Sequence, residues 1–275
     1  MAMTATDFDF LRTVVSRNSG NQIDPSRDYL FESRLGGLLR AQGLTALDQL
    51  VAALKLEPDA RLQRSVAEAM TINETSFFRD NSPFELLRTA LLPALIERRR
   101  HIRSLRFWSA ASSTGQEAWS LAMLLREHFP DLASWRIEIL GTDLSAEMVE
   151  RARAARYQRL EVNRGLPARF LLKYMVRIDD EWEVAPALRP LCRFEQRNLC
   201  RLPVLLDTFD GIFLRNVMLY FSAETRRHVL LEMHRALSPD GFLVLGSSEQ
   251  PGMPQHWLPV LTEKTCYYRP LPAAG

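Results

Sequence analysis

The sequence predicts an α/β protein with a doubly wound, mostly parallel sheet, an all-α N-terminal domain and a small antiparallel β-subdomain. Three observations predict this class. Apolar residues recur with helical spacing, and with no strand pattern, over residues 7–80. Strand-like and helical patterns alternate after residue 103, which is typical of a parallel sheet covered by helices. Two short strand-like runs within residues 173–195 interrupt that alternation.

These patterns divide the chain into four parts. Residues 1–80 are expected to form the helical N-terminal domain, and residues 81–104 a connecting helix and linker. Residues 105–275 are expected to form the catalytic domain, with residues 173–195 inserted in it as the β-subdomain. The domain limits follow the points at which the apolar period changes.

The elements follow from the apolar periods in chain order. Leucines on one face predict a single helix over residues 83–100. Short apolar runs next to turn residues predict strands, and 3.6-residue periods predict helices between them. The expected strands are 105–110, 137–142, 209–214, 241–245 and 265–269, and the expected helices are 117–129, 146–156 and 223–237.

Composition excludes several classes of function. The 275 residues are 47% hydrophobic and 25% charged, with a net charge of +2, so no general attraction to nucleic acid is expected. The three cysteines form no CxxC pair, so neither a disulfide framework nor a metal site is expected. No apolar run reaches about 18 residues, and residues 1–10 lack a basic start. We therefore expect a cytoplasmic protein without membrane insertion.

The segment Ser109–Glu117 follows a strand and opens a helix, which is where a nucleotide-type cofactor binds in such sheets. Gly115 is its only glycine, so it does not match a GxGxxG dinucleotide motif. The Glu117 carboxylate would repel a pyrophosphate but attract a cationic ligand such as S-adenosylmethionine. Stabilisation of the helix dipole explains Glu117 equally well.

Three further segments follow strands. Asp143 could accept the hydroxyls of a ribose, although a helix N-cap is a common role for such a residue. Asn198 and Leu199 could hold the edge and face of an adenine, with a polar turn as the simpler interpretation. Arg215, Asn216 and Tyr220 sit at the end of a buried strand, where packing alone gives little reason for such residues.

The segment Thr71–Asp80 is expected to join the two domains beside these strand ends. It combines two aromatics, Phe77 and Phe78, with small polar residues and Arg79. A guanidinium can bind a carboxylate in a bidentate manner. We therefore expect Arg79 to face the cofactor, the substrate or both.

Taken together, these segments resemble the chemoreceptor glutamate methyltransferases, the CheR family, from about residue 8 to 270. The resemblance is carried by five groups of residues: Thr71–Asn73 with Thr75 and Phe77–Asp80, Trp108–Ala110 through Ser113–Gly115 with Glu117, Thr142–Asp143, Asn198–Leu199, and Phe213 with Arg215–Met218 and Tyr220–Phe221.

The resemblance implies a Rossmann-like methyltransferase sheet and transfer of a methyl group from S-adenosylmethionine to glutamate side chains of chemoreceptor cytoplasmic helices. It implies S-adenosylhomocysteine as the product, no metal, and a monomer. Arg79 and Tyr220 would border the transferred methyl group. The cofactor contacts would be Asn73, Thr75, Arg79, Glu117, Asp143, Asn198, Leu199, Arg215 and Asn216.

The sequence departs from the family pattern at three places. Residues Gln116–Trp119 stand where Glu-Glu-Pro-Tyr is usual, but Glu117 is kept. Gly36 and Gly37 occupy positions that are often basic in the helix thought to meet the receptor. The segment Arg177–Trp182 is short and lacks glycine, which favours an enzyme that does not need the receptor's C-terminal pentapeptide.

Three other functions remain open from the residues. The first is a methyltransferase acting on another protein or a small carboxylate, which the less basic helix around Gly36 favours. The second is an NAD-dependent oxidoreductase, against which Glu117 and the missing glycines argue. The third is a receptor-binding module without activity, against which the retained Arg79 and Asp143 argue.

Overall fold

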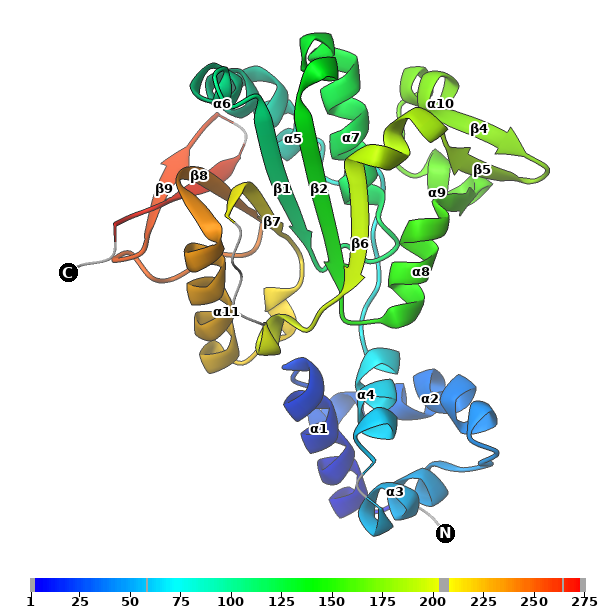
Figure 1. Cartoon of the computed structure of the whole chain (residues 1–275). Helices are drawn as coiled ribbons and strands as arrows, with labels where there is room; N and C mark the ends of the chain where they lie inside the picture. The colour runs from blue at the N-terminus through cyan, green and yellow to red at the C-terminus, as the bar shows by residue number, and fades with distance from the viewer. Residues whose placement is uncertain (1–2, 58, 203–207, 264, 273–275) are drawn as a thin grey trace.

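The computed structural model describes residues 3–57, 59–202, 208–263 and 265–272. The outermost residues of the predicted domains, 1–2 and 273–275, lie outside these ranges. A helical domain lies beneath the carboxyl ends of the strands of a large central sheet, and a small sheet projects from one side (Figure 1). No helix among the described residues is long and apolar enough to cross a membrane.

The N-terminal domain is all-α, as predicted. In α1, Thr4 and Asp7 form a reciprocal capping box, and Gly20 ends the helix with a left-handed φ of 78°. Leucine, valine and phenylalanine side chains from the four helices form a core of their own. The helices are α1 (Ala5–Ser19), α2 (Tyr29–Ala41), α3 (Leu47–Leu56) and α4 (Ala60–Ala69).

The predicted single helix over residues 83–100 is interrupted. It begins as α5 (Ser82–Leu86), widens into a π-helical turn at Leu87–Leu91 and continues as α6 (Leu92–Arg99). Pro93 explains the interruption, because it has no N–H to donate and its ring crowds the preceding turn. The Leu92 N–H bonds to the Leu87 carbonyl, five residues back instead of four. The π-helical turn therefore contains one residue more than an α-helical turn.

The large sheet confirms the mostly parallel prediction. Within the described residues its seven strands run in the order β6-β2-β1-β7-β8-β10-β9. The first five are parallel to one another, whereas β10 is antiparallel to β8 and β9. The strands are β1 (Ser104–Ala110), β2 (Arg136–Asp143), β6 (Cys192–Gln196), β7 (Phe209–Leu214), β8 (Leu237–Leu245), β9 (Trp257–Leu261) and β10 (Cys266–Pro270).

The strand order reverses direction at β1, whose neighbours are β2 on one side and β7 on the other. In open α/β sheets, ligands bind beyond the carboxyl ends of the strands at such a reversal. Buried apolar side chains on both faces of the sheet hold it between helices. The helices that follow these strands are α7 (Gln116–His128), α8 (Ala146–Ala154), and α11 (Ala223–Ala236).

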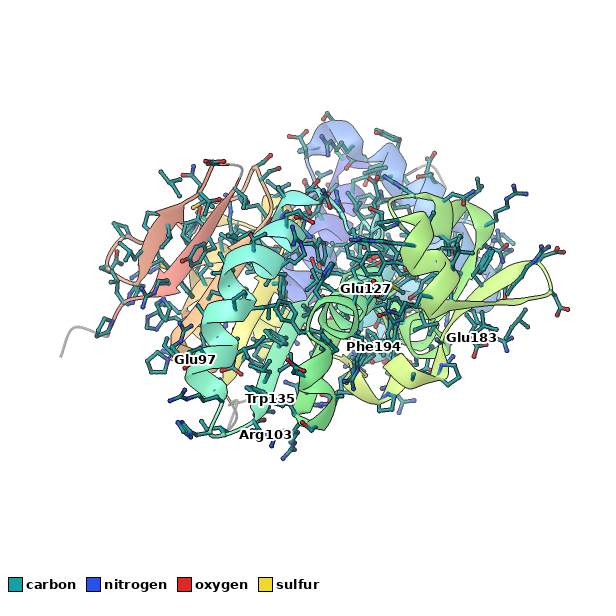
Figure 2. All side chains as sticks on the ribbon, turned by 90° about the horizontal axis from the view of Figure 1, so that it is seen from above. Glu97, Arg103, Glu127, Trp135, Glu183 and Phe194 are labelled. Atoms are coloured by element: carbon teal, nitrogen blue, oxygen red, sulfur yellow. The ribbon has the colours of Figure 1, made fainter. Side chains whose placement is uncertain are left out.

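The small sheet differs in extent from the predicted 173–195 segment. Its strands are β3 (Arg156–Gln158), β4 (Met175–Ile178) and β5 (Glu181–Val184), with α9 (Arg159–Asn163) and α10 (Ala168–Tyr174) between β3 and β4. The end of the predicted segment, β6, instead pairs with β2 in the large sheet. Seen from above, the small sheet, with Glu183, lies at one side of the molecule, away from Glu97 in α6 (Figure 2).

Ion pairs connect the end of α6 to strands β7 and β8, at the end of the sheet opposite the helical domain. Arg99 donates to Asp210 at 2.8 Å and to both oxygens of Asp240 at 2.9 and 2.6 Å. The hydrogen bond from Arg99 lowers the pKa of Asp240. Arg98 also pairs with Asp240, so two of the basic residues at the end of α6 hold this helix against the sheet.

We expect Asp240→Asn to lower the free energy of unfolding by about 1 kcal/mol at neutral pH, because the pair is partly exposed. A lowered carboxylate pKa contributes stability that is present above its unfolded value of 3.8 and is lost as pH falls through the folded value. The difference in urea unfolding between the two proteins should therefore shrink as pH falls below about 3.8. A difference that stays constant with pH would contradict this role. Glu97→Gln, in an exposed pair with Arg100, is the matched control.

Candidate functional site

The loop after β1 builds one wall of a pocket at the carboxyl ends of the strands. Ala111, Ser113 and Gly115 have left-handed φ angles of 63°, 49° and 91°. A Cβ on Gly115 would lie 2.9 Å from the Ala152 Cβ, so only glycine fits there without a shift. These turns bring the backbone of the loop to the surface of the pocket.

Asp143 at the end of β2 is bonded to this loop. Its Oδ2 accepts the Ser113 N–H at 2.8 Å, and its Oδ1 accepts the Ser145 N–H at 3.0 Å. Burial raises the pKa of Asp143, although these backbone hydrogen bonds oppose the rise. Each oxygen keeps further acceptor capacity toward the pocket. The predicted N-cap role falls to Ser145, which accepts the Met148 N–H, so Asp143 is available for a ligand.

The segment between the domains forms a second wall. Ser113 Oγ donates to the Asn73 carbonyl at 2.8 Å, which joins the segment to the loop after β1. Phe77 and Phe78 are buried and pack edge-on against Tyr157 and Phe84. The two aromatics therefore anchor the segment.

Arg79 follows this anchor. It is half-buried, lines the pocket, and donates from Nη1 to the Glu74 carbonyl at 2.7 Å. Thr75 lines the same wall.

Arg215 lines the pocket and takes part in a network of charges. Its side chain is 3% exposed, and it donates to Glu117 at 2.8 Å, to Asp80 at 2.7 Å and to the Arg79 carbonyl at 2.8 Å. Glu117 also accepts a hydrogen bond from Ser109 Oγ at 2.7 Å. Arg215 therefore offsets the charge of the Glu117 carboxylate, which was expected to attract a cationic ligand.

The segment after β7 also faces the pocket. Asn216 has a left-handed φ of 58°, and Tyr220 ends a short 3₁₀ turn, Met218–Tyr220. Both side chains are partly exposed and line the cavity. Two segments far apart in sequence, residues 73–79 and 215–220, therefore meet at one opening.

Asn198 has a different environment from the one predicted. Its Nδ2 donates to the Asn18 carbonyl at 2.7 Å, and its Oδ1 accepts the Cys200 N–H at 2.9 Å. Both ends of the amide are therefore used in joining the domains and starting a 3₁₀ turn, which leaves little of it for an adenine edge. Leu199 is buried and lines the pocket beside it.

The helical domain contributes residues that the sequence did not suggest. Ser19 and Asn21, after the end of α1, line the pocket. The Gln22 N–H donates to the Tyr220 carbonyl at 2.7 Å, and Asn21 pairs with Phe221 in an isolated bridge. In the sequence, Gly20 and its polar neighbours indicate only the end of a helix. They do not indicate that this stretch lies beside Tyr220.

All ten predicted site residues surround one cavity of about 900 Å³, a volume that includes the part open to solvent. Among the described residues, no cluster of three or more His, Cys, Asp or Glu could hold a metal ion. The ten are Asn73, Thr75, Arg79, Glu117, Asp143, Asn198, Leu199, Arg215, Asn216 and Tyr220.

Comparison with known proteins agrees with this architecture. Residues 73–266 match the family model of the CheR methyltransferase SAM-binding domain, and residues 6–71 match that of the CheR methyltransferase all-α domain. Chemotaxis protein methyltransferase 1 of Pseudomonas aeruginosa is 38% identical over 98% of this chain and 99% of its own length.

Two further relatives are similar over most of the chain. Chemotaxis protein methyltransferase Cher2 of Pseudomonas putida is 37% identical over 91% of this chain and 93% of its own. Chemotaxis protein methyltransferase 1 of Vibrio cholerae is 38% identical over 88% of this chain and 87% of its own. The chain therefore belongs to the CheR methyltransferase family and is an S-adenosylmethionine-dependent methyltransferase.

Proposed function

We propose that this protein transfers a methyl group from S-adenosylmethionine to glutamate carboxylates on the cytoplasmic helices of chemoreceptors, forming methyl esters in chemotactic adaptation. The observation that carries the proposal is the single pocket that brings Asp143, Arg79 and Tyr220 together at the strand ends. The names of the relatives support the receptor as substrate. We further propose that the protein acts in the cytoplasm, as a monomer, and without a metal.

The residues of the pocket fit S-adenosylmethionine. Asp143 offers acceptor capacity for ribose hydroxyls, and buried Leu199 offers an apolar surface for a base. Asn73, Thr75, Asn216 and Glu117 complete the proposed contacts. When bound, S-adenosylmethionine supplies a methyl group on a positively charged sulfur and leaves as S-adenosylhomocysteine.

The reaction needs positioning more than acid–base chemistry. A glutamate carboxylate is already ionised near neutral pH, so no general base has to remove a proton from it. Arg79 would hold that carboxylate by charge-assisted hydrogen bonds, and the Tyr220 hydroxyl would donate to one of its oxygens. Holding the acceptor in line is the larger part of the rate gain. Opposite charges combine in the reaction, so a site that excludes water favours it.

Arg215 has a supporting role in this proposal. Its guanidinium is occupied by Glu117, Asp80 and the Arg79 carbonyl. The ion pairs would fix the backbone that carries Arg79, instead of placing Arg215 directly on the cofactor. A buried guanidinium in three such bonds is rigid, which suits a group that holds another in place.

The surface of α2 keeps a second substrate class open. Arg34 is bonded to the Met70 and Thr71 carbonyls at 3.0 and 3.2 Å, so it holds the segment between the domains. A Cβ on Gly37 would meet no atom within 4 Å, which marks an open position without a charge. Arg40 remains as an exposed cation on α2. This weakly basic surface favours another protein or a small carboxylate as the alternative acceptor.

Radioactive methyl transfer to a panel of purified receptor cytoplasmic fragments separates these substrates. We expect labelling of receptor fragments and none of free glutamate or a short peptide containing it. Labelling of small carboxylates with no labelling of any receptor fragment would favour the alternative.

We also expect fragments lacking their last five residues to be methylated at the same rate as intact ones. The small sheet supports this, because β4 and β5 are joined by a two-residue turn, Asp179–Asp180, which leaves no added loop to hold a peptide. A rate that falls at least about tenfold on truncation would contradict the pentapeptide-independent assignment.

A further inference from the structure

Glu249 binds the backbone of the segment that carries Asn216 and Tyr220. It follows β8, is 6% exposed, and accepts four backbone N–H groups. Its Oε2 accepts those of Gly246 at 2.8 Å and Asn216 at 2.7 Å. Its Oε1 accepts those of Val217 at 3.0 Å and Met218 at 2.8 Å. A single carboxylate therefore gathers three consecutive amides of the segment after β7.

This segment needs such an anchor. Asn216 has a φ of 58°, a conformation that costs a non-glycine residue about 1–3 kcal/mol and persists only where neighbours hold it. The amides of residues 216–218 all point to one side, toward Glu249, and the chain continues directly into the Met218–Tyr220 turn. Hydrogen bonds to a charged acceptor are about twice as strong as neutral ones.

The fit around Glu249 is tight. A Cβ on Gly246 would lie 2.6 Å from Glu249 Oε2 and 3.0 Å from the Asn216 nitrogen. Gly246 therefore leaves room for the carboxylate to reach Asn216. Asn216, Val217 and Tyr220 line the proposed cofactor pocket, whereas Glu249 binds the backbone N–H groups of Asn216 and Val217 and lines a different pocket.

We propose that Glu249 is a positioning residue for methyl transfer, fixing Asn216 and Tyr220 through the backbone of residues 216–218. This inference rests on the proposed function, because Tyr220 is its link to the acceptor. An amide has one accepting oxygen, so Glu249→Gln keeps the volume but turns an NH₂ group toward two N–H donors. The segment would then shift, and Tyr220 with it, while Asp143 on β2 would stay in place.

The test measures two quantities, kcat for receptor methylation and the Kd of S-adenosylhomocysteine, in wild type, E249Q and E224Q. Thermal melting curves first establish a temperature at which all three proteins are folded. Glu224 is an exposed glutamate in the first turn of α11, so E224Q is the matched control for lost charge. We expect kcat of E249Q to fall at least about tenfold, because small displacements of positioned groups cost that much. We expect its Kd to weaken by at most about threefold, because Asn216 is one of several proposed cofactor contacts and Asp143 still binds the ribose.

A kcat within about twofold of wild type in folded E249Q would overturn the inference. So would a Kd that weakens as much as kcat falls, because Glu249 would then only shape the cofactor pocket. If E249Q does not fold, Glu249→Asp decides by the same criteria, since it keeps the charge but shortens the side chain, so that one carboxylate no longer reaches all four N–H groups. Absence of receptor methylation by wild type would contradict the proposed function itself, which separates the two failures.

Discussion

Replacing Arg79 with alanine is expected to lower kcat for methyl transfer by about a hundredfold or more, with little change in stability. Loss of a positioned charged group from a reacting centre has effects of this size. The Arg79 side chain is half-buried and donates to the Glu74 carbonyl, so its removal leaves few structural bonds unmade. Phe77 and Phe78 would still anchor the segment. Single-turnover transfer to a receptor fragment, beside a thermal melt, measures both quantities.

Arg164→Ala is the matched control for Arg79. Arg164 pairs with the Glu74 side chain, so the substitution removes a guanidinium that contacts the same segment. Its kcat should stay near that of wild type. Near-normal turnover in folded Arg79→Ala would contradict the proposal that Arg79 holds the acceptor carboxylate. A loss confined to KM for S-adenosylmethionine would assign Arg79 to the cofactor, and a loss in kcat to the acceptor.

Asp143→Ala is expected to weaken S-adenosylhomocysteine binding by about a hundredfold. A hydrogen bond to a charged group contributes about 1.5–3 kcal/mol, and 2.7 kcal/mol corresponds to about a hundredfold in Kd. Titration calorimetry measures the change. Part of the loss would come from the loop, because Ser113 and Ser145 lose their acceptor.

Glu147→Ala controls for the loss of one negative charge near Asp143. It is exposed in the first turn of α8, four residues along the chain. Its Kd should remain within about twofold of wild type. An unchanged Kd in Asp143→Ala would count against a ribose contact at this position.

Much of the site could be predicted, because ligands of parallel sheets bind beyond the carboxyl ends of the strands, and those ends can be located in the sequence. β1, β2 and β7 are buried apolar runs that stand out in the sequence, so the residues after them could be placed at one edge. Strand β9 was not predicted, because Pro259 lies in it and Pro254 lies shortly before it, and prolines are typical of loops. Pro93 similarly broke a helix that apolar spacing made continuous.

The partnerships of the site residues could not be predicted. Arg215, Glu117 and Asp80 come from three segments, and their ion pairs depend on side-chain directions that spacing does not reveal. Asn198 illustrates the same limit, because the Asn18 carbonyl that occupies it lies in the other domain. Glu249 could be recognised only as a strand-end residue, since its role depends on backbone amides of another loop.

The central claim is that the pocket directs methyl transfer to a glutamate carboxylate. The most direct measurement is to incubate the protein with labelled S-adenosylmethionine and a receptor cytoplasmic fragment and then map the label by mass spectrometry before and after mild base. We expect base-labile methyl esters on glutamate side chains, absent with Arg79→Ala and present with Arg164→Ala. Label that resists base, or that sits on another kind of residue, would contradict it.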